Sequence, residues 1–186
     1  MKIPTFSSVT LAAVLALGTL TTSCNKIKDA VKVNIPLQQA EMEFTIPAQA
    51  AGTYTLADMK VRLNVDSAIK ANSSQFNIDN LKSVKMSLAR LTVINADDIN
   101  HLGVISSCSA KLQSNTNNTW ATFADLPSNP ETKATSIDLP VNKDLELKDY
   151  FKGTEFSYMI TGVTRKATTI ALKCKATVKL DLTLGL

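Results

Sequence analysis

The stretch TIALKCKATVKLDLTLGL, residues 169–186, decides the fold class of this chain. Apolar side chains occupy every second position from Ile170 to Leu186, while lysine, threonine and aspartate occupy most positions between them. A period of two places these sets on opposite faces of a β-strand, whereas a helical period of 3.6 would mix the lysines into the apolar face. We therefore predict a long antiparallel strand with one buried side, long enough to bend or carry a bulge.

The same alternation recurs along the rest of the chain. It predicts further strands in residues 31–37, 41–47, 59–65, 83–94, 104–112, 135–141 and 155–163. In the fourth of these segments the apolar phase shifts by one position between Leu88 and Leu91, which predicts a β-bulge. Clusters of Gly, Pro, Asn and Ser between the segments mark turns.

About eight to nine strands without a long helix predict an all-β, antiparallel β-sandwich. We expect it to be immunoglobulin-like, with a closed barrel as the alternative. One or two short helical turns are expected, near residues 77–83 and 145–153. Gly153 is expected to end the second of them in a left-handed conformation.

The N-terminus has the pattern of an export signal. Lys2 precedes the apolar run VTLAAVLALGTL, residues 9–20, and small residues follow at 21–23. As a helix this run would span about 18 Å, which is too short for a hydrocarbon core of about 30 Å. A charged start, a short apolar run and small residues before a cleavage site are typical of a secretory signal peptide.

The small residues followed by Cys24 resemble the lipobox of bacterial lipoproteins. The resemblance implies removal of residues 1–23, acylation of Cys24, a lipidated tether over residues 24–30 and a single domain over residues 31–186. Several acyl chains, at about 0.8 kcal/mol per buried methylene, hold a soluble domain firmly at a bilayer. An ordinary cleaved signal with an incidental cysteine is the alternative. Asn25 stands where inner-membrane lipoproteins have aspartate, which favours the outer membrane. Whether the domain faces the periplasm or the cell surface is not decided by the sequence.

Charge and motif content exclude several function classes. The 20 basic and 16 acidic residues are spread along the chain, whereas a nucleic-acid surface needs a basic stripe. The sequence has no phosphate-binding glycine loop, nucleophile elbow, HExxH or CxxC motif. The single histidine, His101, lies near Asp97 and Asp98 in a turn, which is typical of a solvated loop rather than a metal or acid-base site. We therefore expect no enzyme, no metal and no cofactor; a hydrolase is the least favoured hypothesis.

Three further features are candidate sites. Cys108 and Cys174 either form a disulfide in an oxidising compartment or lie buried as free thiols. Asp-Ser-Ala at 66–68 matches a short O-glycosylation motif of Bacteroidota that would modify Ser67, although helix capping at a strand end explains these residues more simply. Trp120 follows an asparagine-rich turn, where it either packs in the core, the commoner fate, or forms an exposed patch that binds carbohydrate or protein.

The signal, Cys24 and the strand-rich body together resemble the small β-sandwich lipoproteins of Bacteroidota. That resemblance implies a cell-envelope role and brings no catalytic residue with it. We expect a non-enzymatic lipoprotein, anchored to the outer membrane, that binds an envelope protein as an accessory subunit of a larger assembly. The alternative is a lipoprotein that holds a glycan or an apolar molecule between its sheets. A flat apolar surface would favour the protein partner, and a deep cavity open at one end of the sandwich would favour the ligand.

Overall fold

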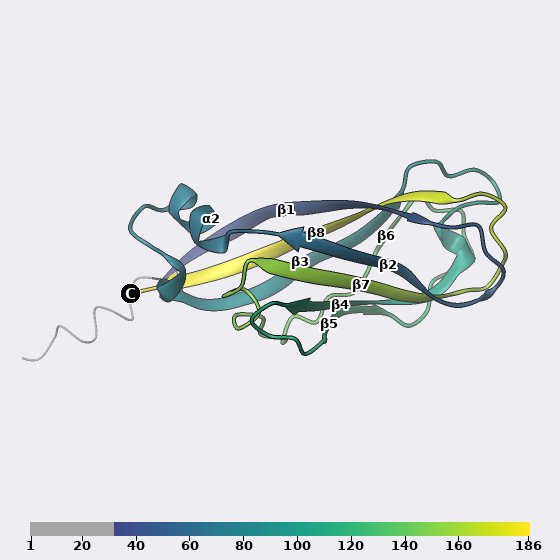
Figure 1. Ribbon diagram of the computed structural model, residues 1–186. Helices are drawn as coiled ribbons and strands as arrows, with labels where there is room; N and C mark the ends of the chain where they lie inside the picture. Colours follow the sequence, from purple (N-terminus) through teal and green to yellow (C-terminus); the bar gives the residue numbers. More distant parts are fainter. Residues whose placement is uncertain (1–31) are drawn as a thin grey trace, which may run out of the picture.

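The computed structural model describes residues 32–186, which form two stacked four-stranded sheets (Figure 1). The strands are β1 (Lys32–Ile46), β2 (Gly52–Arg62), β3 (Leu81–Val93), β4 (Ile105–Ser114), β5 (Ala121–Leu126), β6 (Ser136–Asp138), β7 (Glu155–Thr164) and β8 (Leu172–Gly185). The helical segments are α2 (Val65–Asn72) and the 3-10 turns η1 (Ile78–Asn80) and η2 (Leu102–Val104). The prediction of an all-β antiparallel sandwich is confirmed.

The strands pair as a nested hairpin. β1 pairs with β8, β2 with β7, β3 with β6 and β4 with β5, each pair antiparallel. The additional pairs β3–β8 and β4–β7 complete sheets of order β1-β8-β3-β6 and β2-β7-β4-β5. A long hairpin rolled over itself in this way is a jelly roll, whereas immunoglobulin domains group their strands as ABED and CFG. The alternation predicted the class and not this connectivity, because it sets which face is buried and not which strand lies alongside.

The stretch that predicted the fold becomes β8, which lies between β1 and β3. Its inward-facing leucines are buried, namely Leu172, Leu180, Leu182 and Leu184. Full burial of a leucine side chain contributes about 1.5–3 kcal/mol, so this face of β8 anchors the core. Ile170, expected in the same strand, instead lies exposed in the preceding loop, where the ladder has not yet begun.

A bulge is present in β3, but it comes before Leu88 and not between Leu88 and Leu91 as predicted. Met86 is opposite Leu180 and Leu88 is opposite Lys179, so Ser87 is the extra residue in the ladder. The buried positions of β3 change from even to odd numbers across this point. The bulge therefore directs Val84 and Met86 before it and Ala89, Leu91 and Val93 after it into the core, whereas Leu88, expected to face inward, is only half-buried.

The helix α2 is not among the predicted helical turns, although helix capping was one explanation of residues 66–68; the capping residue is Asn64 and not Asp66 or Ser67. Asn64 caps it, because its side chain accepts a hydrogen bond from the Ser67 N–H at 2.9 Å. Val65 and Ile69, one turn apart, are buried and attach the helix to the sandwich.

The two predicted helical turns differ in outcome. The turn near residues 77–83 is η1, whereas residues 145–153 form hydrogen-bonded turns without a regular helix. Gly153 is not left-handed, because no residue in the described part of the chain has a positive φ. A Cβ atom there would meet Asn115 Oδ1 and Thr116 Oγ1 of the loop after β4, so those side chains would have to move.

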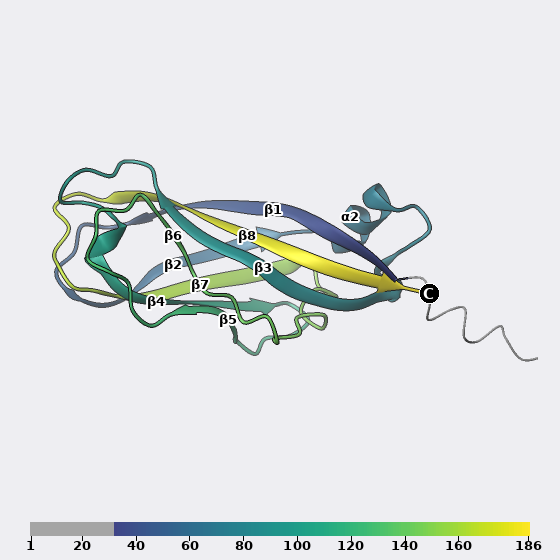
Figure 2. The ribbon, with the colours of Figure 1, turned by 180° about the vertical axis from the view of Figure 1, so that it is seen from behind.

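The elongated sandwich has two distinct ends (Figures 1 and 2). The start of β1, the C-terminus, α2 and the β4–β5 loop lie at one end, which we call the terminal end. The β1–β2, β3–β4 and β7–β8 loops lie at the other, the loop end. The predicted signal, Cys24 and the tether lie outside the described residues. Within residues 32–186, no helix is long and apolar enough to span a membrane.

Candidate binding surfaces

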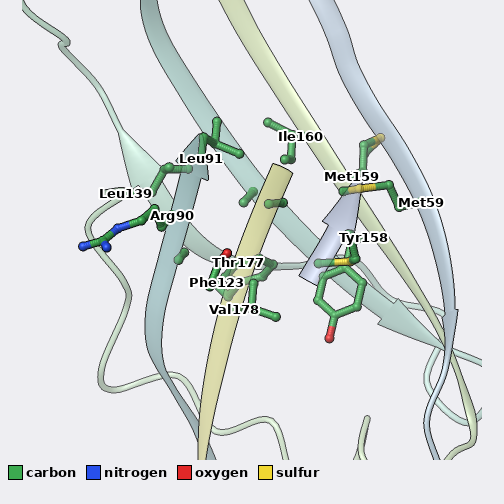
Figure 3. Close-up of a pocket in the computed structure, with 14 residues that line it drawn as sticks. Met59, Arg90, Leu91, Phe123, Leu139, Tyr158, Met159, Ile160, Thr177 and Val178 are labelled. Atoms are coloured by element: carbon green, nitrogen blue, oxygen red, sulfur yellow. The ribbon is translucent and has the colours of Figure 1, made fainter. Parts of the chain in front are cut away.

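The cavity between the two sheets is small (Figure 3). It measures about 20 Å³ and is lined mainly by apolar side chains, among them Met59, Phe123, Leu139 and Tyr158. Such a volume is room for about one water molecule, whereas ligand pockets measure about 300–1,000 Å³. This cavity therefore does not suit the alternative in which an apolar molecule lies between the sheets.

Cys108 and Cys174 are buried free thiols, which corresponds to the second of the two alternatives drawn from the sequence. They belong to different sheets, Cys108 to β4 and Cys174 to β8. Burial raises the pKa of each thiol to about 12, with a smaller contribution from the charge of Asp125 at Cys108. Both side chains therefore stay protonated at neutral pH and act as small apolar groups.

His101 has a structural role at the loop end. Its Nδ1 accepts a hydrogen bond from the Gly103 N–H at 3.0 Å and so caps η2. Nearby, Asp97 accepts hydrogen bonds from the side chain and N–H of Asn100 and from the N–H of Ile99, which lower its pKa. Within residues 32–186, no group of three or more His, Cys, Asp or Glu side chains is placed to hold a metal ion.

The loop end carries three exposed isoleucines. Ile94, Ile99 and Ile170 are 61%, 61% and 40% exposed. Among residues 33, 34 and 41–186, whose exposure is described, the other exposed large apolar side chains are Trp120, in the loop before β5, and Leu186, at the C-terminus. Ile94 and Ile99 were not among the candidate residues, and Ile170 was expected on the buried face of the last strand. The signal in the sequence at Ile99 was an apolar residue within a polar turn. We call Ile94, Ile99 and Ile170 the isoleucine surface.

Side-chain amides hold the two loops of the isoleucine surface together. Asn100, which is buried, accepts the Thr169 N–H at 2.9 Å. Asn95 donates from its side chain to the Ala171 carbonyl, also at 2.9 Å. These bonds lie on either side of Ile170 and join the β3–β4 loop to the β7–β8 loop, so the surface is formed before any partner binds.

Charged side chains surround a hollow of about 210 Å³ beside Ile99. Asp98 forms an ion pair with Lys133 at 2.5 Å, and Glu131 forms one with Lys166. The hydrogen bonds from these lysines lower the pKa of both carboxyl groups. Apolar residues with a charged rim are typical of the surfaces that bind other proteins.

Trp120 lies on the surface at the terminal end. Packing in the core, which the sequence analysis gave as the commoner fate of a tryptophan, is therefore not its position. Its side chain is 37% exposed, and the residue directly precedes β5. The last pair of the β4–β5 ladder joins Ala121 to Leu112, and both point inward. Trp120 and its neighbour Gln113 on β4 therefore face outward, because side chains alternate along a strand. Ser67 on α2 is exposed, and its glycosylation stays a prediction.

Comparisons with known proteins show only distant similarity. No family model and no curated protein matches the chain. Solved structures that resemble it include infectious bursal disease virus Gt strain, 17% identical over 83% of this chain and 33% of that chain, with a TM-score of 0.37. A 60-mer BFDV capsid protein is 13% identical, with coverages of 84% and 95% and a TM-score of 0.32. Desmodium yellow mottle tymovirus is 14% identical, with coverages of 100% and 97% and a TM-score of 0.27.

This chain thus spans about one third of the length of the infectious bursal disease virus chains that it matches. Similarities at this level of identity and TM-score carry no inference about function.

Proposed function

We propose that this chain is a non-enzymatic lipoprotein, anchored to the outer membrane through Cys24, that binds an envelope protein through the isoleucine surface. The observation that carries the proposal is the position of that surface, on hydrogen-bonded loops with charged groups around them. A filled sandwich interior favours a partner at the surface over a ligand between the sheets.

The anchor and the isoleucine surface would lie at opposite ends of the molecule. β1 starts at the terminal end, and residues 24–31 reach at most about 28 Å when fully extended. β8 has 14 residues, so it covers about 45 Å between the two ends. A domain tethered at residue 24 can therefore present Ile94, Ile99 and Ile170 away from the membrane.

Burial of the isoleucines would supply the apolar centre of the interface. Each isoleucine contributes about 1.5–3 kcal/mol when fully buried, and a stable interface buries about 800 Å² on each partner. Aspartate in place of these side chains would put charges at the centre and destabilise the complex. The ion pairs of Asp98 and Glu131 would lie at the rim, where they set orientation more than affinity.

The proposal is tested by chemical cross-linking in intact cells followed by purification in detergent, at native expression. The double variant Ile99→Asp/Ile170→Asp should lose the partner that the wild-type protein retains. Leu186→Asp is the matched control, because Leu186 is an equally exposed apolar residue at the other end. Equal recovery of the partner with the double variant, or recovery of the wild-type protein alone, would refute partner binding. An unmodified N-terminus found by mass spectrometry would refute the anchor.

A further inference from the structure

An open groove of about 600 Å³ lies at the terminal end, beside the sheet β2-β7-β4-β5. Its lining comes from β2, β4, β7 and the loop after β4, and most of the lining side chains are polar. The volume lies within the range of ligand sites. The groove is at the opposite end from the isoleucine surface, so it calls for a separate explanation.

A row of outward-facing side chains crosses the strands in this groove. Lys60 on β2 is opposite Ser157 on β7, and Ser157 is opposite Gln113 on β4. Trp120 does not line the groove; it directly precedes β5, one position beyond the last ladder pair, Ala121 with Leu112, so the register extends the row to it outside the groove. Since neighbouring strands lie about 4.8 Å apart, the row spans about 14 Å. A linear ligand lying across the strands would contact all four side chains.

Much of the hydrogen-bonding capacity along this row is unused. Within the described part of the chain, the side chains of Lys60, Gln113, Asn118 and Ser157 form no hydrogen bond or ion pair. An ammonium group, two carboxamides and a hydroxyl group are therefore available to a ligand. The exposed indole of Trp120 adds an apolar face at one end of the row.

A second row, next to the first, is held in place by contacts within the protein. Arg62 and Glu155 are opposite each other on β2 and β7 and form an ion pair at 2.7 Å. Asn115 Oδ1 accepts hydrogen bonds from the N–H groups of Thr154 at 3.1 Å and Glu155 at 3.3 Å. These contacts fix the loop after β4 against the start of β7, so the groove does not have to form when a ligand binds.

The combination fits a saccharide chain. The C–H face of a sugar ring packs on an indole, while sugar hydroxyl groups exchange hydrogen bonds with carboxamides and hydroxyls. Lys60 has no acidic partner and Arg62 has one, so the groove carries an excess positive charge that favours sugars bearing carboxylates. We propose that this groove binds an acidic oligosaccharide that extends past its edge, with a carboxylate at Lys60 in the groove and a ring on Trp120 beside it.

Trp120 makes the binding directly measurable, because it is the single tryptophan of the chain. We would titrate the purified lipoprotein in detergent with trigalacturonic acid and, separately, with the neutral trisaccharide cellotriose. Trigalacturonic acid should shift or quench the tryptophan emission, with cellotriose binding more weakly. No change in emission with either sugar would overturn the site. Equal affinity for both sugars would overturn the assignment of an acidic ligand.

Variants separate the two contacts by calorimetry. Trp120→Ala should weaken trigalacturonic acid binding about tenfold, by loss of stacking. Lys60→Gln should weaken it about three- to fivefold and leave cellotriose binding unchanged. Lys179→Gln is the matched control, because Lys179 is an exposed lysine of the other sheet, and it should change neither. Wild-type affinity in Trp120→Ala or Lys60→Gln would refute the contact assigned to that residue.

The two proposals fail independently. Trp120→Ala should retain the cross-linked envelope partner, and Ile99→Asp/Ile170→Asp should retain the emission change with trigalacturonic acid. Loss of both activities in either variant, with an unchanged circular dichroism spectrum, would show that the two surfaces are not separate and would overturn the second site.

Discussion

Asn129→Asp tests the hydrogen bonds that hold the loop end together. Asn129 is 6% exposed, and its Nδ2 donates to the carbonyls of Leu102 at 3.0 Å and Ile105 at 2.8 Å. The backbone carbonyl of Asn129 accepts a hydrogen bond from the Arg165 side chain. Aspartate has nearly the same shape but no donor when ionised, so the substitution replaces two hydrogen bonds by two contacts between oxygens.

The expected loss follows from these contacts. Two hydrogen bonds contribute about 1–3 kcal/mol together, and a buried, poorly paired charge adds to the cost. The nearby cation of Arg165 offsets part of this addition, so we expect the free energy of unfolding to fall by about 2–4 kcal/mol at pH 7. Because burial beside carbonyls raises the folded-state pKa of the new carboxyl above its unfolded value, the deficit should shrink as pH falls through that pKa.

Urea unfolding followed by circular dichroism at pH 7 and at pH 4.5 measures both effects. Each variant is compared with the wild-type protein at the same pH. Asn118→Asp is the matched control, because Asn118 is exposed and its side chain forms no hydrogen bond within the described residues, and it should stay within about 0.5 kcal/mol of wild type. A deficit below about 1 kcal/mol at pH 7 for Asn129→Asp, or an equal deficit at both pH values, would refute the reasoning.

Further outcomes follow from the core, the groove and the thiols. Leu182→Ala should lower the free energy of unfolding by about 2–5 kcal/mol through loss of buried apolar contact, against less than about 0.5 kcal/mol for the exposed Lys179→Ala, measured by urea unfolding. Gly153→Ala should cost about 1–3 kcal/mol by displacing the Asn115 side chain from its hydrogen bonds with the Thr154 and Glu155 N–H groups, and it should also weaken trigalacturonic acid binding; wild-type values for both would contradict the packing described. Cys108 and Cys174, with pKa values raised to about 12, should react with Ellman's reagent at pH 8 only after unfolding, whereas no reaction in denaturant without a reductant would show that they are paired.

The fold was predictable where the signal was local. Alternation along β8 and the phase shift in β3 each depend on neighbouring residues, so the buried face of β8 and the presence of a bulge in β3 followed from the sequence, although the bulge lies at Ser87 and not after Leu88. Which strand pairs with which is not set by neighbouring residues, because each strand could direct its apolar side chains into the core beside several different partners. The jelly-roll order therefore became visible only in the structure.

The helix α2 shows a second limit. An eight-residue helix is too short for a clear helical period, and the alternation before it continues up to Val65. Part of its support comes from elsewhere in the chain, because Asp66 accepts the Ile78 N–H at 2.9 Å. The hydrogen bonds to Lys70 and to this N–H lower the pKa of Asp66.

The groove was only partly visible in the sequence. Trp120 could be singled out as a candidate because a tryptophan after a polar turn is unusual. Lys60, Gln113 and Ser157 carried no such mark, since outward-facing polar residues occur on every strand. Their alignment depends on the registers of two ladders that join distant parts of the chain.

The nested strand order has a consequence for folding. β1 and β3 are not neighbours in their sheet, and each of them pairs with β8, so this sheet cannot assemble before β8 is in place. Pairings between segments so far apart in the sequence close large loops before their contacts form, which makes folding slow. Until β8 inserts, the facing edges of β1 and β3 stay unpaired and can pair with strands of other chains, so aggregation competes with folding at this step.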